Sequence, residues 1–306
     1  MGIVVIGATF VDIKGFPEDT YVPTGRNVGR VEYIHGGVAR NVVEDIANVE
    51  LRPTFLGIVD DTPMGADVLQ KLNNHKVNTE YVLTIPGGMG TWLAVFDNNG
   101  DVAGSISKRP NMLPIVDLLE EKGNEIFSKA DSVVLEVDLD KEIVKLTLEL
   151  AKKHGVQVFG LVSNMSIAAK RRDFLRSFDC FICNQLEAGL LFLDDYIDKT
   201  PEQMRQILAE KVIQAAIPSM VVTMGDQGAV YATGEGLSGV CPARNVQVKD
   251  TTGAGDAFCA GVSIGLTYGK TMPEAIEIGS ILAASVITSS ENVCPRFQPA
   301  ELGIQV

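Results

Sequence analysis

Short runs of apolar residues, rich in Val and Ile, recur along the chain, and most are followed by a stretch with helical periodicity. The runs lie at 3–6, 54–59, 132–137, 157–161, 180–183 and 220–224. The stretches 63–73, 141–154 and 201–215 carry apolar residues every three or four positions, as amphipathic helices do. Strands that are apolar throughout and alternate with helices are typical of a parallel sheet covered on both faces. We therefore predict one α/β domain over residues 1–306, with a doubly wound, mainly parallel sheet.

Two segments, approximately 12–36 and 84–108, interrupt this alternation. Both are rich in Gly, Thr and Asn, and the second has apolar residues at alternate positions. The sequence Asn98-Asn99-Gly100 between two such runs predicts a hairpin turn. A small sheet inserted beside a doubly wound core can close over a ligand crevice. We expect the two segments to form a β-sheet lid.

Composition excludes several classes of partner and compartment. The net charge of −13 argues against binding to nucleic acid or to an anionic membrane, since either needs a basic surface. The N-terminal apolar run is interrupted at Asp12 and predicts a buried strand rather than a signal peptide. Five cysteines show no disulfide spacing, and a buried strand explains Cys180 and Cys183 better than a zinc or redox site. We expect a cytoplasmic protein.

The stretch 248–266, "VKDTTGAGDAFCAGVSIGL", sets Asp256 between very small residues. A glycine-rich turn that starts a helix leaves N–H groups free at the positive end of the helix dipole, where phosphoryl oxygens bind. Asp256 would lie in the first helical turn, and there an ionised acid can take a proton from a hydroxyl group during phosphoryl transfer. The alternative is that Asp256 only caps a helix after a flexible turn.

The longer string "DTTGAGDAF", residues 250–258, favours the first interpretation. It resembles the C-terminal signature of the ribokinase-like (PfkB-type) carbohydrate and nucleoside kinases, and the resemblance extends over almost the whole chain. It implies that Asp256 is the catalytic base, and that ATP is the phosphate donor with Mg²⁺ as its partner. It also implies an anion hole for the γ-phosphate, formed by the N–H groups of Gly253, Ala254 and Gly255.

A second family signature, a double-glycine turn followed by Asn, matches Gly36, Gly37 and Asn41. Paired glycines let the backbone approach a ligand closely, and Asn offers a donor and an acceptor to hydroxyl groups. The resemblance implies that these residues bind the sugar. For Arg40, beside Asn41, we expect a pair with a carboxylate instead of contact with substrate. It implies further substrate contacts from Asp12, Asn27, Glu136 and Lys170. For Glu136, a solvated charge at a strand end is an equally good interpretation.

The resemblance also implies residues for the nucleotide and for ions. The ATP site would comprise Asn184, Thr223, Gly225, Gly228, Gly253, Gly255 and Gly279. Glu187 follows Asn184 in an Asn-x-x-Glu element and would hold Mg²⁺ through water. Asp250 and Thr252 match positions that bind a monovalent cation, K⁺, with carbonyl groups from about 284–292. By the same resemblance, the lid insert suggests a homodimer.

The identity of the acceptor is less well determined than the reaction. The stretch around Asn27, Gly29 and the double glycine, and the ending "SSENVCPRF", resemble the pseudouridine kinase branch. We therefore predict phosphorylation of pseudouridine to pseudouridine 5′-phosphate. Other sugars such as ribose and fructose, other nucleosides, and a catalytically silent sensor of nucleoside and ATP remain alternatives. A nicotinamide-dependent oxidoreductase would need G-x-G-x-x-G after the first strand, and residues 7–12 lack it.

Overall fold

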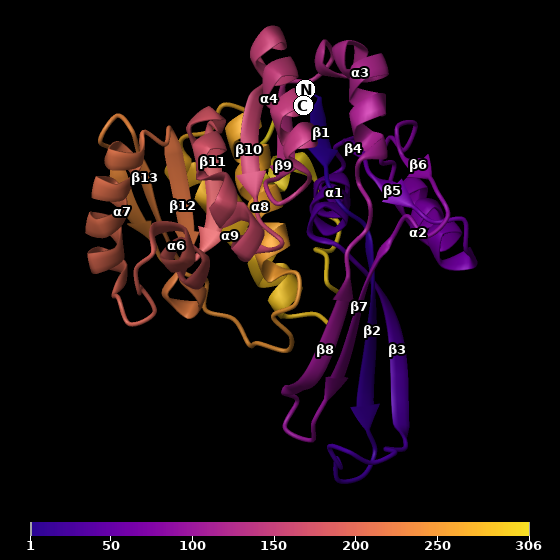
Figure 1. The fold of residues 1–306 in the computed structure, drawn as a ribbon. Coiled ribbons are helices and arrows are strands. Elements are labelled where there is room, and N and C mark those ends of the chain that lie inside the picture. The colour runs from indigo at the N-terminus through magenta and orange to yellow at the C-terminus, as the bar shows by residue number, and fades with distance from the viewer. Residues whose placement is uncertain (1, 306) are drawn as a thin grey trace.

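The apolar runs of the sequence form an eight-stranded sheet in the computed structural model, which describes residues 2–305 (Figure 1). The strand order is β14-β13-β12-β11-β10-β9-β1-β4. All neighbours from β4 to β12 pair in parallel, and only the pairs β12–β13 and β13–β14 at one end of the sheet are antiparallel. This confirms the predicted mainly parallel sheet. The strands are β1 (Ile3–Ile6), β4 (Thr54–Leu56), β9 (Ser132–Glu136), β10 (Gln157–Leu161), β11 (Cys180–Asn184), β12 (Ser219–Thr223), β13 (Ala229–Thr233) and β14 (Ser238–Cys241).

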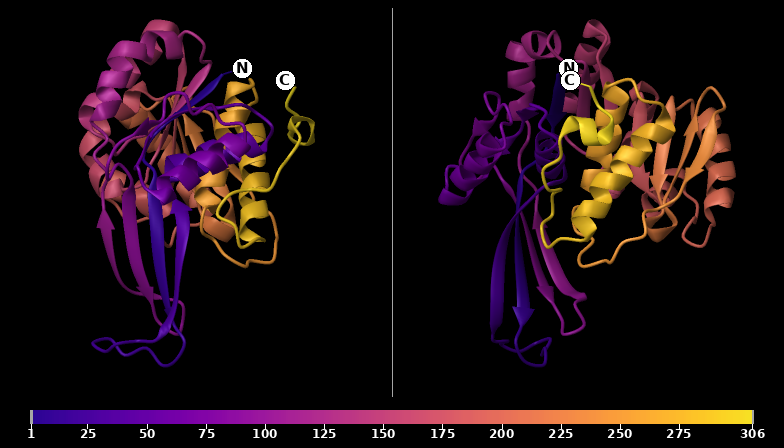
Figure 2. Two further views of the ribbon diagram at one scale, coloured as in Figure 1. Left: turned by 90° about the vertical axis from the view of Figure 1, so that its right-hand side faces the viewer. Right: turned by 180° about the vertical axis from the view of Figure 1, so that it is seen from behind.

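Each face of this sheet has its own hydrophobic core, because successive side chains of a strand point to opposite faces. Val4 and Ile6 of β1 belong to a core that includes helices α3 (Pro114–Phe127), α4 (Lys141–His154), α6 (Gln185–Phe192) and α7 (Pro201–Ala215). Ile3 and Val5 belong to the opposite core, with helices α1 (Val38–Asn48), α2 (Pro63–Asn74), α8 (Ala254–Thr267) and α9 (Met272–Ile287). Seen from behind, α8 and α9 (yellow) cover that second face (Figure 2). Helices on both faces confirm the doubly wound architecture.

The predicted strand over 54–59 is divided in two at Gly57. β4 joins the large sheet, whereas β5 (Ile58–Val59) pairs with β6 (Leu83–Thr84) in a separate two-stranded sheet. A Cβ atom on Gly57 would lie 2.5 Å from the ring of Phe55, so the chain leaves the large sheet at a residue without a side chain. The short helices are α5 (Met165–Ala168), η1 (Ala169–Ser177), η2 (Gly225–Gln227) and η3 (Pro299–Leu302).

A four-stranded sheet projects from the α/β core at the end where β2 follows β1 (Figure 1). It comprises β2 (Phe10–Pro17), β3 (Gly29–Gly36), β7 (Gly90–Phe96) and β8 (Val102–Lys108), in the order β3-β2-β7-β8. The predicted hairpin joins β7 to β8, with Gly100 at φ 86°. At the far end, the Asn98 side chain accepts the N–H of Tyr21 and donates to the carbonyl of Asp19. This region, called the small sheet below, is built from the two segments predicted as a lid.

The cysteines form no disulfide within the part of the chain that the structure describes. All five are free, and Cys180 and Cys183 are buried in β11. Within residues 2–305, no three His, Cys, Asp or Glu side chains are grouped as a metal cluster. The helices in the described part of the chain are all too short or too polar to cross a bilayer.

Candidate active site

The glycine-rich turn before Asp256 has a shape that its neighbours impose. Gly253 is the N-cap of α8 and has φ 81°, a conformation that favours glycine. A Cβ atom there would lie 2.0 Å from the carbonyl oxygen of Asn292, whereas Gly255 faces open space. The N–H group of Ala254 donates to Thr251 at 3.2 Å, but those of Gly255 and Asp256 have no backbone acceptor within residues 2–305. The start of α8 can therefore bind an anion.

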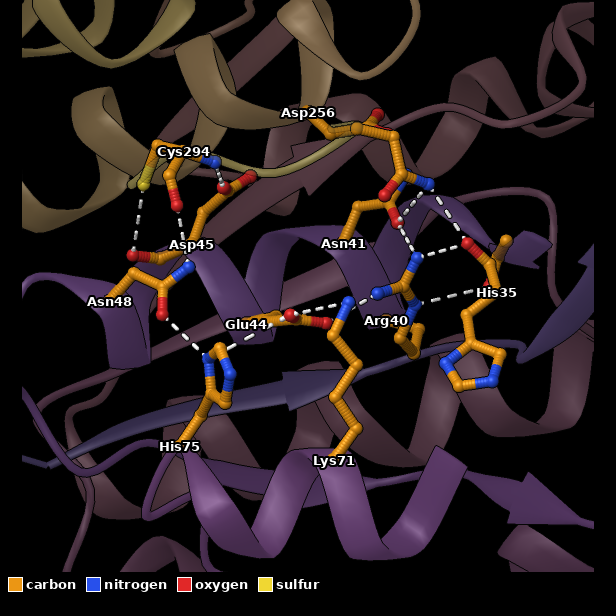
Figure 3. Close-up of polar contacts among 12 residues, drawn as sticks. His35, Arg40, Asn41, Glu44, Asp45, Asn48, Lys71, His75, Asp256 and Cys294 are labelled. Atoms are coloured by element: carbon orange, nitrogen blue, oxygen red, sulfur yellow. Dashed lines mark hydrogen bonds and ion pairs between the residues drawn. The ribbon is translucent and has the colours of Figure 1, made fainter. Parts of the chain in front are cut away.

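Asp256 lies in the first turn of α8 and faces helix α1. Its Oδ2 accepts a 2.6 Å hydrogen bond from the Asn41 side-chain amide (Figure 3). Burial raises the pKa of Asp256 to about 6; the Asn41 bond and the Arg40 charge oppose the rise, and the carboxylates of Asp12 and Glu187 add to it. A carboxylate with this pKa is ionised at neutral pH and is more basic than an ordinary Asp.

The double-glycine turn brings the predicted sugar residues to Asp256. Gly37 has φ 98°, and a Cβ atom on it would lie 2.6 Å from the carbonyl oxygen of Ala8. A Cβ atom on Gly36 would lie 2.5 Å from the carboxylate of Asp12, which projects from β2. Burial raises the pKa of Asp12. The structure thus gathers, at the junction of α1, β2 and α8, the predicted residues Asp12, Gly36, Gly37, Asn41 and Asp256.

A buried network orients Asn41. The Arg40 guanidinium donates to the Asn41 side-chain oxygen and to the carbonyl of His35 (Figure 3). Because its oxygen accepts from Arg40, the Asn41 side chain turns its NH₂ group toward Asp256. Arg40 also forms a buried 2.5 Å ion pair with Glu44, which confirms the expected carboxylate partner. Asn292 donates to the His35 carbonyl at 2.8 Å. We predicted Asn292 only as the end of the range 284–292 with carbonyl ligands for K⁺; its side chain lies 251 positions from Asn41, and no spacing connects the two.

Glu136 ends β9 and is bound by main chain on both carboxyl oxygens. It accepts the N–H of Ala8 at 3.1 Å and that of Ala39 at 2.9 Å. Burial raises the pKa of Glu136 to about 8. The side chain is neither a solvated charge nor free to turn, and it joins the end of β1 to the start of α1. Its contact with a substrate stays a prediction.

Two other predicted substrate residues make no contact with Asp256. Asn27 lies in the loop at the far end of the small sheet, where its side chain accepts the N–H of Val22 at 2.8 Å and donates to its carbonyl at 3.0 Å. Lys170 is exposed in η1 and makes no hydrogen bond or ion pair within residues 2–305. Their roles in binding stay predictions.

The residues predicted for ATP and Mg²⁺ lie at the carboxyl ends of neighbouring strands. Asn184 ends β11 and pairs in register with Thr223 of β12. Asn184 and Glu187 cap α6 reciprocally, with two 2.8 Å hydrogen bonds. Burial raises the pKa of Glu187, and only one of its oxygens is engaged in the cap. Mg²⁺ in proteins usually takes one or two carboxylates together with phosphate oxygens, so Glu187 suits this ion.

The predicted glycines of the nucleotide site have different surroundings. Gly225 has φ 60° and open space at its Cβ position, whereas a Cβ atom on Gly228 would meet the Cys241 carbonyl at 2.1 Å. Gly279 is buried in α9, where a Cβ atom would lie 2.7 Å from the Phe258 carbonyl of α8. Gly279 therefore allows the two helices to pack closely, and its contact with ATP stays a prediction.

The predicted monovalent-cation residues lie beside the end of α9. Asp250 accepts the N–H of Thr252 at 2.8 Å, and this bond lowers the pKa of Asp250. The N–H of Lys249 donates to the carbonyl of Ile287 at 2.9 Å, so the turn before α8 runs along the segment expected to supply carbonyl ligands. The K⁺ site itself stays a prediction.

Comparisons with known proteins agree with this architecture. Residues 2–294 match the family described as pfkB family carbohydrate kinase. A guanosine-inosine kinase of Exiguobacterium acetylicum is 34% identical over 292 residues, which cover 95% of each chain. A pseudouridine kinase of Escherichia coli (strain K12) is 25% identical over 275 residues, covering 90% of this chain and 86% of the relative.

Among solved structures, Arabidopsis thaliana ribokinase, in complex with ribose and ATP, has a TM-score of 0.86 at 22% identity and covers 98% of this chain and 97% of its own. This similarity confirms the ribokinase-like fold. The family match extends over nearly the whole chain. The protein therefore belongs to the pfkB family of carbohydrate kinases, enzymes that transfer a phosphoryl group to a hydroxyl group of a sugar or nucleoside.

Proposed function

We propose that the protein is an ATP-dependent kinase that phosphorylates the 5′-hydroxyl group of a nucleoside. The observation that carries the proposal is the 2.6 Å contact between Asn41 and Asp256 at the start of α8. It joins an oriented base with a pKa of about 6 to a helix N-terminus that begins with Gly253 and has two N–H groups without a backbone acceptor within residues 2–305. A nucleoside as acceptor is supported by the guanosine-inosine kinase at 34% identity.

In this mechanism the acceptor hydroxyl lies against Asp256, which takes its proton as the oxygen bonds to the γ-phosphorus and the bond to the ADP oxygen breaks. The free N–H groups of Gly255 and Asp256 face the charge that develops on the transferring phosphoryl group. Asn41 holds the carboxylate in place, while Asp12 and the backbone at Gly37 hold the sugar. A closed small sheet would keep out the water that otherwise accepts the phosphoryl group.

ATP as the donor is supported by the ribokinase neighbour, whose structure was solved with ribose and ATP. Asn184, Thr223 and Gly225 would line its site at the carboxyl edge of the sheet. Mg²⁺, when bound, neutralises charge on the phosphates, and Glu187 would hold it through water. Asp250 and Thr252 would bind K⁺ beside the anion hole and so order the glycine-rich turn.

Two classes of nucleoside are the leading acceptors. The relative at 34% identity, a guanosine-inosine kinase, favours 6-oxopurine nucleosides. Pseudouridine is the second candidate, supported by the 25% identical pseudouridine kinase and by the resemblance around Asn27 and Gly29. We place guanosine and inosine first because the guanosine-inosine kinase matches more of the chain, and at higher identity, than the pseudouridine kinase does.

The test is ADP release with guanosine, inosine, pseudouridine, ribose and fructose as acceptors, in wild type and in Asp256→Asn. We expect nucleosides to be the best acceptors. General-base catalysis contributes about 10²–10⁴-fold, so the variant should lose at least about 10²-fold in kcat while it still binds ATP. Asp117→Asn is the matched control, because Asp117 is an exposed acid in the first turn of α3. Unchanged turnover in Asp256→Asn would remove the mechanism.

We also propose a homodimer formed through the small sheet. Tyr33, Ile13, Leu93 and Ile106 are register partners across its four strands, so they form one apolar row on one face. Tyr33 and Ile106 are 61% and 71% exposed. The row includes the middle of every strand, and a second copy of the same face would cover it. A cytoplasmic location stays a prediction.

A further inference from the structure

A small cavity lies beside the candidate active site, at the carboxyl ends of β9 and β10. Its volume is about 150 Å³. Pockets that enclose a whole drug-sized ligand are typically about 300–1,000 Å³, so this cavity suits one part of a nucleoside only. Its walls combine apolar side chains with charged ones, principally Phe10, Met112, Arg109, Asp138, Ser163 and Arg171.

The cavity borders the predicted sugar site. Phe10 lines it, and Asp12 follows two residues later on the same face of β2. Ala8 and Glu136 also line it, and these two are joined by the hydrogen bond that anchors the start of α1. Gly37 packs against the backbone of Ala8. A nucleoside whose ribose lies between Asp12 and Asp256 thus has this cavity as its neighbour.

Two arginines bring unused hydrogen-bond donors to the cavity. Arg109 donates one N–H to the Asp138 carbonyl at 2.9 Å, and Arg171 donates one to the Val137 carbonyl at 3.1 Å. A guanidinium carries five N–H donors, so each arginine keeps others for a ligand. The Asp138 carboxylate, in contrast, already accepts the N–H and the hydroxyl of Ser163 at 2.9 and 2.8 Å.

The charged groups of the cavity are two arginines and three acids. The guanidinium groups of Arg109 and Arg171 share the cavity with the carboxylates of Asp140 and of Asp138, which lies 3.7 Å from Arg109. Burial raises the pKa of Glu136 to about 8, so this third acid is mostly protonated at neutral pH. The unused N–H groups of the two arginines therefore favour a ligand group that presents oxygen or nitrogen acceptors.

We propose that this cavity takes the base of the nucleoside, and that Arg109 and Arg171 donate hydrogen bonds to a carbonyl oxygen of that base. This inference rests on the proposed nucleoside kinase function. It predicts selection of oxo-bases over amino-bases, because an exocyclic amino group would set its donors against the donors of the arginines. Hypoxanthine, guanine and uracil rings carry such an oxygen, whereas adenine carries an amino group at that position.

The experiment compares inosine with adenosine, which differ only in the group at C6 and its tautomer. We expect wild-type kcat/KM to be at least about tenfold higher for inosine, as a hydrogen bond to a charged group provides. Arg171→Met and Arg109→Met should each lower kcat/KM for inosine about tenfold, chiefly through KM, and should not lower it for adenosine, so the inosine-to-adenosine ratio falls. Uridine against cytidine repeats the comparison for pyrimidines.

Arg172→Met is the matched control. Arg172 is next in sequence to Arg171, but its guanidinium donates to the Leu190 carbonyl at 3.2 Å, outside the cavity lining. Its loss should leave the inosine-to-adenosine ratio unchanged. Arg171→Lys keeps the charge without the planar fork and should give an intermediate ratio. A thermal unfolding curve for each variant checks that it is folded.

Several outcomes would overturn the inference. One is a wild-type preference for adenosine, and another is an unchanged ratio in folded Arg171→Met and Arg109→Met. A third is faster turnover of fructose 6-phosphate than of inosine, which would indicate that the arginines bind the phosphate group of a sugar phosphate. Absence of ADP release with every nucleoside would instead refute the proposed function, whereas turnover with an unaltered ratio refutes only the base site.

Discussion

At the scale of single residues, the raised pKa of Asp256, the proposed base, predicts the pH dependence of the reaction. Because the base must be ionised, kcat/KM should fall about tenfold per pH unit below an apparent pKa of about 6. The measurement is ADP release at saturating ATP between pH 5 and 8. A profile flat from pH 5 to 7 would contradict the assignment of Asp256 as base.

Replacement of Asn41 should shift the pH profile and so gives a second, independent test. The Asn41 amide stabilises the ionised carboxylate, so its removal should raise the pKa of Asp256 further. In Asn41→Ala we expect the inflection of the pH profile to move above that of wild type, in addition to weaker binding of acceptor. An inflection at the wild-type pH would show that the bond does not act on the base.

The ionised Asp256 carboxylate should also lower the stability of the folded protein at neutral pH. Its folded pKa, about 6, is above the ordinary value of 3.8, so the folded state binds the proton more tightly than the unfolded state. The stabilisation from this proton is complete below pH 3.8 and is lost as the pH rises through 6. We therefore expect Asp256→Asn to have a Tm at pH 8 at or above that of wild type, with the difference shrinking toward pH 4. A clear loss of Tm at pH 8 would contradict this expectation.

At the scale of elements, α1 is unusual because its polar side chains are buried. Arg40, Glu44 and Asp45 are almost fully buried, and Glu44 also pairs with Lys71 of α2 at 3.0 Å. The N–H of Cys294 donates to Asp45 at 2.6 Å (Figure 3). The helix thus joins α2, the segment near residue 294 and Asp256 through hydrogen bonds and ion pairs, in addition to the apolar residues that it contributes to the core.

This network predicts a large loss of stability in Glu44→Gln. The change leaves the buried Arg40 guanidinium without its carboxylate, which typically costs about 3–5 kcal/mol. Turnover should fall as well, since Arg40 would no longer hold the Asn41 oxygen. The control is Glu149→Gln, which removes an exposed pair with Lys145 at the same i,i+4 spacing and should change stability by under about 1 kcal/mol. Urea denaturation of both variants provides the comparison; equal losses would argue against the network.

The elements were well predicted where local pattern decides them. The predicted bounds 3–6, 157–161, 141–154 and 201–215 coincide with β1, β10, α4 and α7, because uniform apolar runs and amphipathic periodicity are local signals. The break at Gly57 and the partners of α1 could not be found in this way. Both depend on residues far along the chain: β6 pairs with β5, and Cys294 binds Asp45.

At the scale of the whole molecule, the apolar row of the small sheet predicts the oligomeric state. Tyr33→Lys and Ile106→Lys should each convert a dimer to a monomer, because a charge would be buried at the centre of the contact. The control is Ser105→Lys, since Ser105 is exposed on the same strand but pairs with Ala94 on the other face. Sedimentation velocity distinguishes the species. A wild type that is monomeric at all concentrations would refute the dimer.

The overall arrangement of the site could be predicted only in part. The motifs around Gly37 and Asp256, 219 positions apart by their numbers, do meet in the structure through Asn41. Sequence alone could not show that the oxygens of Glu136 are bound by the main chain, or that Arg171 rather than Lys170 lines a cavity. Such facts depend on side-chain direction, which spacing along the chain does not determine.

The two hydrophobic cores on opposite faces of the sheet should differ in how well they tolerate mutation. The helices that carry Asn41 and Asp256 share one core, while α4 and α7 rest on the other side of the sheet. Mutations in the core beneath α4 and α7 should lower stability without changing the geometry around Asn41 and Asp256. The exposed faces of these two helices are therefore the better place for labels or tethers.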